Sequence, residues 1–174
     1  MKEKRLFTFA VMLMLGLSSL MAQIDGKWKA DKHFKEEMEI DENMDLVLEF
    51  REQIFADFSI IISGNIDGII MSMKSTIPGT YTRKGNDVKI YWEETKFYSE
   101  IIDLRATTPE TQKFLNDPEM RKAIYGFAKE RTFKPEHVKT FTNVLSNFTI
   151  KSITNDAMVI DIPDFMEITF LREK

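Results

Sequence analysis

The sequence predicts a mainly β protein, an antiparallel up-and-down β-barrel with a helical insertion before its last strands. Three observations favour this fold class. Apolar and polar residues alternate with a period close to two from 45 to 104, which is typical of strands with one buried face. The period becomes helical between about 108 and 146, and the strand period then returns. Finally, Trp28 and Arg172 face inward on the first and last strands, where they can stack if those strands are neighbours.

The N-terminal residues 1–22 are typical of a secretory signal peptide. Positions 2–5 are mostly basic, the apolar run from Leu6 to Leu17 is too short to span a bilayer, and a cleavage site follows Ala22. No cysteine follows this site, and a lipid anchor at the cleavage site requires one. We therefore expect one mature domain, residues 23–174, that is periplasmic or secreted and has no stable membrane anchor.

The charge and the cysteine and histidine content of the chain argue against several kinds of partner and cofactor. The chain has 24 Lys and Arg against 28 Asp and Glu, and loss of the basic leader leaves the mature domain more acidic. This charge repels phosphate backbones, so we expect no nucleic-acid partner. The absence of cysteine excludes disulfides and thiolate metal sites, and the two histidines, His33 and His137, lie far apart in the chain. We expect neither a metal nor another cofactor.

The strands can be assigned in chain order. The first runs from Gly26 to Asp31, with Trp28 facing inward. Residues 32–44 are charged and weakly periodic, which favours a long loop or a short surface helix. The expected inward residues of the next strands are Leu46, Leu48 and Phe50; Phe58, Ile60 and Ile62; Ile69, Met71 and Met73; Tyr81 and Arg83; and Val88, Ile90 and Trp92. A less clearly sided strand runs from Lys96 to Leu104.

Turn-forming residues separate these strands. Glycine and asparagine tolerate the positive φ angles of tight connections. We therefore expect turns at Ser63-Gly64-Asn65, Asp67-Gly68 and Gly85-Asn86-Asp87, and we expect Pro78-Gly79 to introduce a new strand.

Two helix starts mark the insertion. Thr108-Pro109-Glu110 and Asp117-Pro118-Glu119 each combine a capping side chain, a proline at the first helical position and an acid in the first turn. A third helical segment begins at Pro135. Strands are expected again from Phe148 to Ile153, through Met158, Ile160 and Ile162, and from Asp164 to Arg172.

The chain resembles the lipocalin and wider calycin superfamily. Gly26-Lys27-Trp28 directly after a signal peptide, successive hairpins and a closing strand ending in Arg172 are similar to the small exported lipocalin-like domains of gut Bacteroidetes. The resemblance implies structural roles for Gly26, Trp28 and Arg172, with the arginine covering the tryptophan. The chain departs from the family in two ways: it lacks the Thr-Asp-Tyr motif, and it carries the helical block before the closing strands.

A barrel of this size either fills with side chains or leaves room for one small ligand. The expected lining is almost wholly apolar, which favours non-covalent binding of a small hydrophobic or amphipathic molecule. Only Tyr81 and Arg83 among these residues supply polar groups. The candidate lining residues are Phe50, Phe58, Ile60, Ile62, Met71, Met73, Tyr81, Arg83, Ile90, Trp92, Met158, Ile160 and Met166. The same alternation also fits side chains that simply pack against each other.

The rival hypothesis is a protein-interaction module with a filled barrel. Its contact surface would be the helical insertion at residues 118–131, where Met120, Ile124 and Phe127 form an apolar stripe for a partner protein or a second copy. Cavity volume separates the hypotheses, because drug-sized guests occupy about 300 to 1,000 Å³. A smaller cavity favours the rival.

The sequence gives little support for catalysis. It contains no Gly-x-Ser-x-Gly elbow, phosphate-binding loop or helical histidine pair with a glutamate. Glu93 and Glu94 are neighbours in a strand and face opposite sides, so they cannot act on one substrate. We expect that the protein is not an enzyme.

Overall fold

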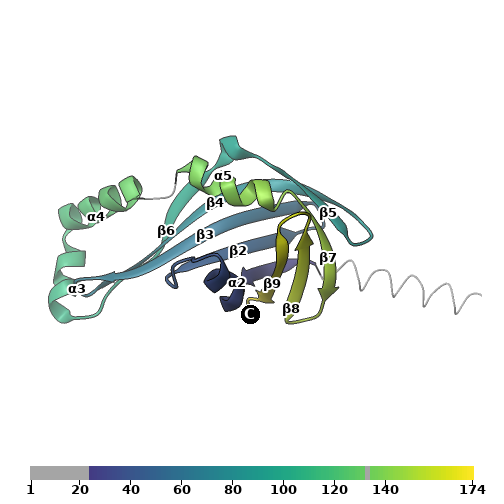
Figure 1. Cartoon of the computed structure of the whole chain (residues 1–174). Helices are drawn as coiled ribbons and strands as arrows, with labels where there is room; N and C mark the ends of the chain where they lie inside the picture. Colours follow the sequence, from purple (N-terminus) through teal and green to yellow (C-terminus); the bar gives the residue numbers. More distant parts are fainter. Residues whose placement is uncertain (1–23, 132–133) are drawn as a thin grey trace, which may run out of the picture.

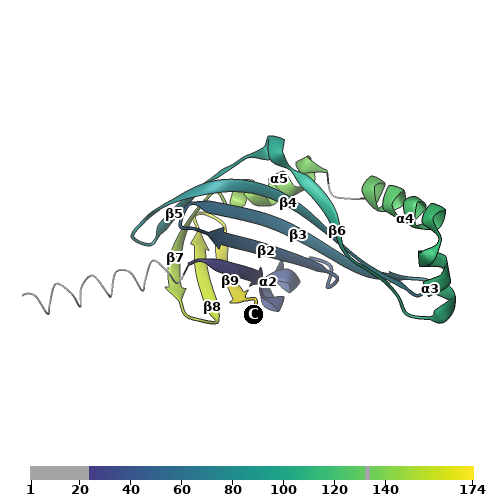
Figure 2. The same ribbon diagram turned by 180° about the vertical axis from the view of Figure 1, so that it is seen from behind.

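The structure is a computed structural model that describes residues 24–131 and 134–174. The expected signal peptide lies outside the described residues. Within the described part of the chain, nine strands form one antiparallel sheet, and eight of them close into an up-and-down barrel (Figures 1 and 2). This confirms the predicted fold class, including helices before the last strands.

The elements have the following bounds. The barrel strands are β1 (Gly26–Ala30), β2 (Met44–Arg51), β3 (Phe55–Ile66), β4 (Ile69–Lys84), β5 (Asp87–Trp92), β7 (Asn147–Ile153), β8 (Ala157–Ile162) and β9 (Met166–Arg172). Strand β6 (Tyr98–Ala106) pairs with the first half of β4, on the edge that β5 occupies farther along. The helices are α2 (Lys32–Glu37), α3 (Pro109–Asn116), α4 (Pro118–Arg131) and α5 (Pro135–Val144), and a short 3₁₀ helix, η1 (Glu94–Lys96), precedes β6.

The first and last strands close the barrel. β1 and β9 pair antiparallel, with Trp28 opposite Arg172. The Arg172 guanidinium carbon lies 4.3 Å from the centroid of the Trp28 ring, a cation–π contact over a fully buried indole. Arg172 Nη1 also donates to the backbone oxygen of Asp25 at 3.1 Å, and Trp28 Nε1 donates to that of Ile24 at 2.7 Å. These contacts join the two ends of the described chain.

Strands β3 and β4 are longer than the turn signals indicate. Ser63-Gly64-Asn65 lies inside β3, and Pro78-Gly79 lies inside β4, so both expected breaks between strands are wrong. The register runs without interruption from Phe55 opposite Thr80 to Ile66 opposite Ile69, and the turn is at Asp67-Gly68, where φ is +51° and +82°.

The sheet tolerates Pro78 for a physical reason. On its second edge, β4 pairs with β6 up to Thr76 and with β5 from Gly79 onward, so Pro78 lies where the neighbour changes. A missing N–H costs least at such an interruption of the ladder. The Pro78 carbonyl accepts a hydrogen bond from the Glu93 N–H at 2.8 Å.

The hairpin of β3 and β4 extends beyond the barrel. β2 pairs with β3 only as far as Ile62, so the tip of the hairpin is joined only by β6 (Figure 1). We call the tip of the hairpin together with β6 the extension. α3 packs on β6 near the tip, α4 returns along the extension, and α5 lies over the barrel (Figures 1 and 2).

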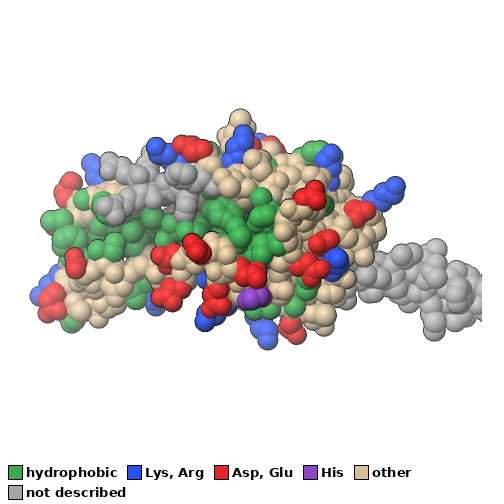
Figure 3. Space-filling model, in the orientation of Figure 1, with side chains coloured by type: hydrophobic (Ala, Val, Ile, Leu, Met, Phe, Trp, Pro, Cys, Tyr) green, Lys and Arg blue, Asp and Glu red, His purple; other side chains and the backbone are tan. Residues whose placement is uncertain are grey.

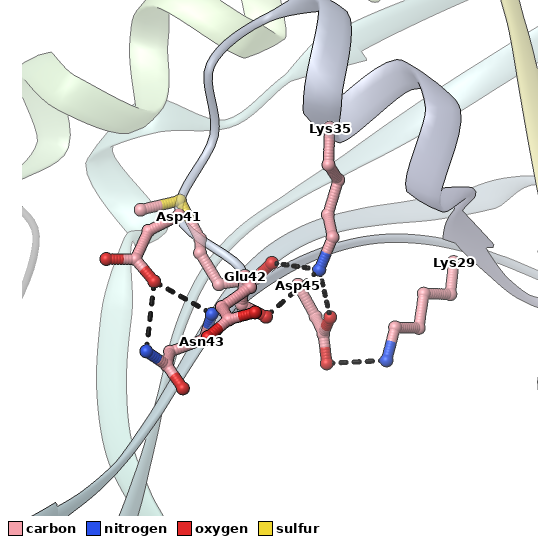
Figure 4. Close-up of polar contacts among 7 residues, drawn as sticks. Lys29, Lys35, Asp41, Glu42, Asn43 and Asp45 are labelled. Atoms are coloured by element: carbon pink, nitrogen blue, oxygen red, sulfur yellow. Dashed lines mark hydrogen bonds and ion pairs between the residues drawn. The ribbon is translucent and has the colours of Figure 1, made fainter.

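The charged segment 32–44 is a short helix followed by a loop. Asp31 caps α2 by accepting from the Phe34 N–H at 2.9 Å. Lys35 fastens the following loop, because its Nζ donates to the Met44 carbonyl at 2.9 Å and to Asp45 Oδ1 at 3.2 Å (Figure 4). Lys29 binds the other carboxylate oxygen of Asp45 at 2.6 Å. This network fixes α2 beside the open end of the barrel.

Candidate functional site

The barrel interior is filled by its own side chains. The candidate lining residues that lie in this core, each at most 5% exposed, are Phe50, Phe58, Ile60, Tyr81, Ile90, Met158 and Ile160. Trp92 and Met166 are partly buried and pack against the same core. Large apolar side chains in mutual contact leave little free space, as in any well-packed interior.

The polar candidates lie at the end of the barrel where Arg172 covers Trp28. Burial, together with the nearby charge of Asp25, raises the pKa of Tyr81 to about 12. The Tyr81 ring meets Phe50 edge-on at 4.9 Å between centroids. Arg83 Nε donates to the Gly85 carbonyl at 2.8 Å, in the turn after β4. Tyr81 is therefore part of the core, and Arg83 holds a turn.

The open end of the barrel contains a small hollow. It measures about 190 Å³ and is lined by Phe34 and Met38 on the α2 side, by Phe141 and Val144 of α5, and by Phe58 of the barrel. This volume lies below the roughly 300 Å³ of a typical drug-sized guest. The barrel alone thus favours the filled alternative.

Helix α5 is fixed over this hollow. Trp92 Nε1 donates to the Thr142 carbonyl at 2.8 Å, which joins β5 to α5. The rings of Phe58 and Phe141 lie 5.9 Å apart, and those of Phe58 and Trp92 lie 6.4 Å apart. An aromatic cluster therefore forms the wall between the core and the open end.

Beyond the barrel, the inward face of the sheet continues as an apolar floor. Two candidate lining residues, Met71 and Met73, lie here instead of in the barrel core, and a third, Ile62, packs against that core and also faces this floor. With Gly64, Ile66 and Phe127 they surround a hollow of about 120 Å³. Phe127 comes from α4, so the helical insertion forms one wall.

A larger hollow of about 470 Å³ follows at the tip of the extension. Its lining comes from the hairpin and from α3, namely Ile66, Asp67, Ile69, Glu110, Thr111 and Phe114. Thr107 and Thr111 each donate a hydroxyl to the Gly68 carbonyl, at 2.9 and 3.2 Å, which fastens α3 to the tip. Asp67 and Glu110 make this end of the site acidic.

The three hollows follow one another along β3, and together we call them the trough. Phe58 lines the first, Ile62 the second, and Ile66 both the second and the third. Eight residue steps at about 3.3 Å each separate Phe58 from Ile66, so the three hollows span about 26 Å along β3. The buried Ile60 lies between the first hollow and the second. Figure 3 shows a strip of hydrophobic side chains running along this face of the molecule.

The opposite face of the extension is mainly polar. Ser63 and Ser72 point there and share a hydrogen bond of 2.8 Å. Lys74, which follows Met73, lies on the same polar face. The sheet of the extension therefore has one face for water and one for an apolar contact.

Sequence reasoning missed several trough residues. The turn prediction covers the region of Gly64 and Ile66, and the sequence analysis assigns no role to Phe114. The period-two alternation places Ile62, Gly64 and Ile66 on one face of a strand if no turn is assigned at Gly64. This alternation is the sequence signal that could have identified them.

The described residues offer no other obvious chemical centre. Among them, no three His, Asp or Glu side chains lie close enough together to hold a metal ion. None of the helices in the described ranges combines the length and apolarity needed to span a membrane.

The fold and the site define an antiparallel β-barrel with a filled core and a trough that runs from the open end of the barrel along the extension. No family model, curated protein or solved structure matches the chain.

Proposed function

We propose that the protein is an exported, lipocalin-like binding protein without enzymatic activity that holds one elongated hydrophobic or amphipathic molecule non-covalently. The binding site is the trough, not the barrel interior. One observation carries this proposal: hollows with a mainly apolar lining line up along β3, from the open end of a filled barrel to the tip of the extension. An open apolar strip of this kind is typical of a ligand groove or an interaction surface.

The shape of the trough favours a linear alkyl chain. Burial of one methylene contributes about 0.8 kcal/mol. Ten methylenes therefore contribute about 8 kcal/mol, which corresponds to a dissociation constant near 1 µM before the cost of immobilising the ligand. The methionines of the floor, Met71 and Met73, adapt to irregular guests because their side chains are unbranched and flexible.

The charge at the tip selects the head group. Asp67 and Glu110 line the hollow at that end, and no basic side chain is part of its lining among the described residues. A carboxylate placed there would be repelled, whereas an ammonium group would be attracted. A long-chain amine should therefore bind more tightly than the carboxylic acid of equal length.

Ligand titration tests the proposal. Dodecylamine and lauric acid are titrated into the purified protein while tryptophan fluorescence and heat are measured. Trp92 packs against Phe58, which lines the first hollow, whereas Trp28 is sealed in the core. We expect saturable binding at one site, a fluorescence change that disappears in Trp92→Phe, and heat that remains in that variant.

A matched pair of variants locates the ligand. Met73→Glu puts a charge on the trough floor. It should lower the affinity for dodecanol, a neutral ligand, and for lauric acid at least about tenfold, because an unpaired carboxylate there must be desolvated when the ligand binds. Ser72→Glu adds the same charge on the opposite face and should leave affinity unchanged. Equal effects of the two variants, or no saturable binding at all, would contradict the proposal.

The second candidate function is the protein-interaction module. The small volume of the hollow at the open end of the barrel favours it. On α4, Met120 is 42% and Phe127 43% exposed. If this candidate is correct, the protein elutes as an oligomer or in a complex, ignores alkyl ligands, and loses that association in Met120→Glu.

A further inference from the structure

Strand β6 has a free edge. It pairs on one side with β4, and the described residues place no strand on its other side. The backbone N–H and C=O groups along that side therefore have no ladder partner there. Such an edge is a template for one more strand.

A hollow lies directly along this edge and is separate from the trough. It measures about 690 Å³, which exceeds the volume of each of the three trough hollows, and it runs beside residues 97–101. Tyr125 and Ala128 of α4 line it from the other side. The space between a free strand edge and a helix suits an extended chain, because each residue of such a chain can pair with the edge while alternate side chains enter the hollow.

The lining of the hollow indicates which side chain it would take. Tyr98 and Tyr125 are 44% and 45% exposed, and Glu100 is the one charged residue of the lining among the described residues. Tyr98 and Glu100 are two residues apart in β6 and so share one face of the strand. A cation beside the Tyr98 ring and the Glu100 carboxylate gains both cation–π and Coulomb attraction. A lysine or arginine side chain has this chemistry.

No ion pair among the described residues involves Glu100. Arg105 is paired with Asp103 at 3.1 Å, Lys139 with Glu94 at 3.0 Å, and Lys96 with Glu93. Lys74 lies opposite Glu100 in the register but forms no ion pair with it in the described part of the chain. The carboxylate thus remains available to a partner.

We propose that β6 binds an extended segment of a partner polypeptide, added as a further strand, with a lysine or arginine placed against Glu100 and beside Tyr98, while the neighbouring side chains of that segment enter the hollow toward α4. The occupant is a peptide strand with alternating apolar residues around one basic residue. This inference does not rest on ligand binding in the trough, since the two sites share no lining residue among those described.

Labelled synthetic peptides test the inference by fluorescence anisotropy. One peptide alternates threonine and valine around a central lysine, a second has a central glutamate, and a third is the lysine peptide with N-methylated alternate amides. We expect the lysine peptide to bind about tenfold more tightly than the glutamate peptide, because opposite charges attract across a strand pair and like charges repel. The N-methylated peptide should not bind, because it cannot form the ladder.

Charge reversal provides the matched variant. Glu100→Lys should reverse the preference, so that the glutamate peptide binds better, while Glu119→Lys, the same charge reversal at an exposed acid that does not line this hollow, should leave the preference unchanged. Glu100 is exposed, so the variant should keep the circular dichroism and thermal midpoint of the parent protein.

Three results would overturn the inference. These are the absence of saturable lysine-peptide binding by the folded protein, an unchanged preference in Glu100→Lys, and equal binding of the N-methylated peptide. Self-association that Glu100→Lys abolishes, with no peptide bound, would assign the edge to a second copy and would also overturn it.

Discussion

Gly26 shows how one residue makes the closure of the barrel possible. Its φ is +135°, a backbone conformation that side chains strongly disfavour, and a Cβ there would lie 3.1 Å from Arg172 Nη1. A side chain at position 26 would therefore displace the guanidinium over Trp28 by a few tenths of an ångström, in addition to the strain in the backbone. The Gly-x-Trp pattern thus has a direct physical reason in this chain.

We predict that Gly26→Ala lowers the free energy of unfolding by about 3 kcal/mol, through backbone strain and displacement of Arg172. The control is Gly85→Ala, where φ is +62° but no atom lies within 4 Å of the added Cβ. In that variant the free energy of unfolding should fall by only about 1 kcal/mol, because the left-handed backbone conformation is the only source of strain. Urea unfolding measures both, and equal losses would show that contact with Arg172 is unimportant.

Tyr81 predicts a pH effect at the same scale. Its pKa is raised to about 12, first by burial and then by the charge of Asp25, whereas the unfolded chain has the ordinary value of 10.0. Between these values the folded state holds a proton that the unfolded state releases, so stability falls as pH rises from 10.0 toward 12. Tyr81→Phe should remove the part of the fall in stability that comes from Tyr81. Urea unfolding of both proteins across this pH range measures the difference. An identical pH dependence in the variant would contradict it.

At the scale of elements, the trough depends on a hairpin that runs past the barrel. The alternation of Ile62, Met71 and Met73 predicts which way these side chains face, but it cannot show that the strands outlast β2. Ser63-Gly64-Asn65 has the composition of a turn, yet it pairs as strand because β4 offers partners along its whole length and Ser63 bonds Ser72. Tertiary pairing overrides the local preference here.

The helical insertion was easier to predict. Thr108 caps α3 with a capping box, and Pro109 and Pro118 begin α3 and α4. These signals are local, so the sequence alone contains them. The packing of Phe127 over the sheet of the extension depends on distant residues and therefore appears only in three dimensions.

The acidic tip gives a prediction for the same elements. In the double variant Asp67→Asn, Glu110→Gln, the preference for dodecylamine over lauric acid should disappear, because the charges that attract the ammonium group are gone. Calorimetric titration of both ligands measures this. As a control, Glu119→Gln changes an exposed acid of α4 that lines none of the hollows described, and the preference should remain.

For the whole molecule, closure and filling of the barrel decide where a site can form. One ring of strands was predictable, because period-two alternation and the facing Trp28 and Arg172 are both visible in the sequence. Whether the ring is hollow was not predictable, since packing of the same apolar residues decides it. Phe50, Phe58 and Met158 fill the ring, so the free apolar surface lies on the extension instead.

The joining of the two chain ends has a practical consequence for experiments on this molecule. Asp25 accepts a hydrogen bond from Arg172, and Glu173 donates one to Lys27, so both ends of the described chain lie together on the barrel. Helix α3 lies at the far end of the extension (Figures 1 and 2). A sensor chip or bead coupled through position 24 or through the C-terminal Lys174 would thus hold each molecule by the barrel, with the acidic tip at the opposite end.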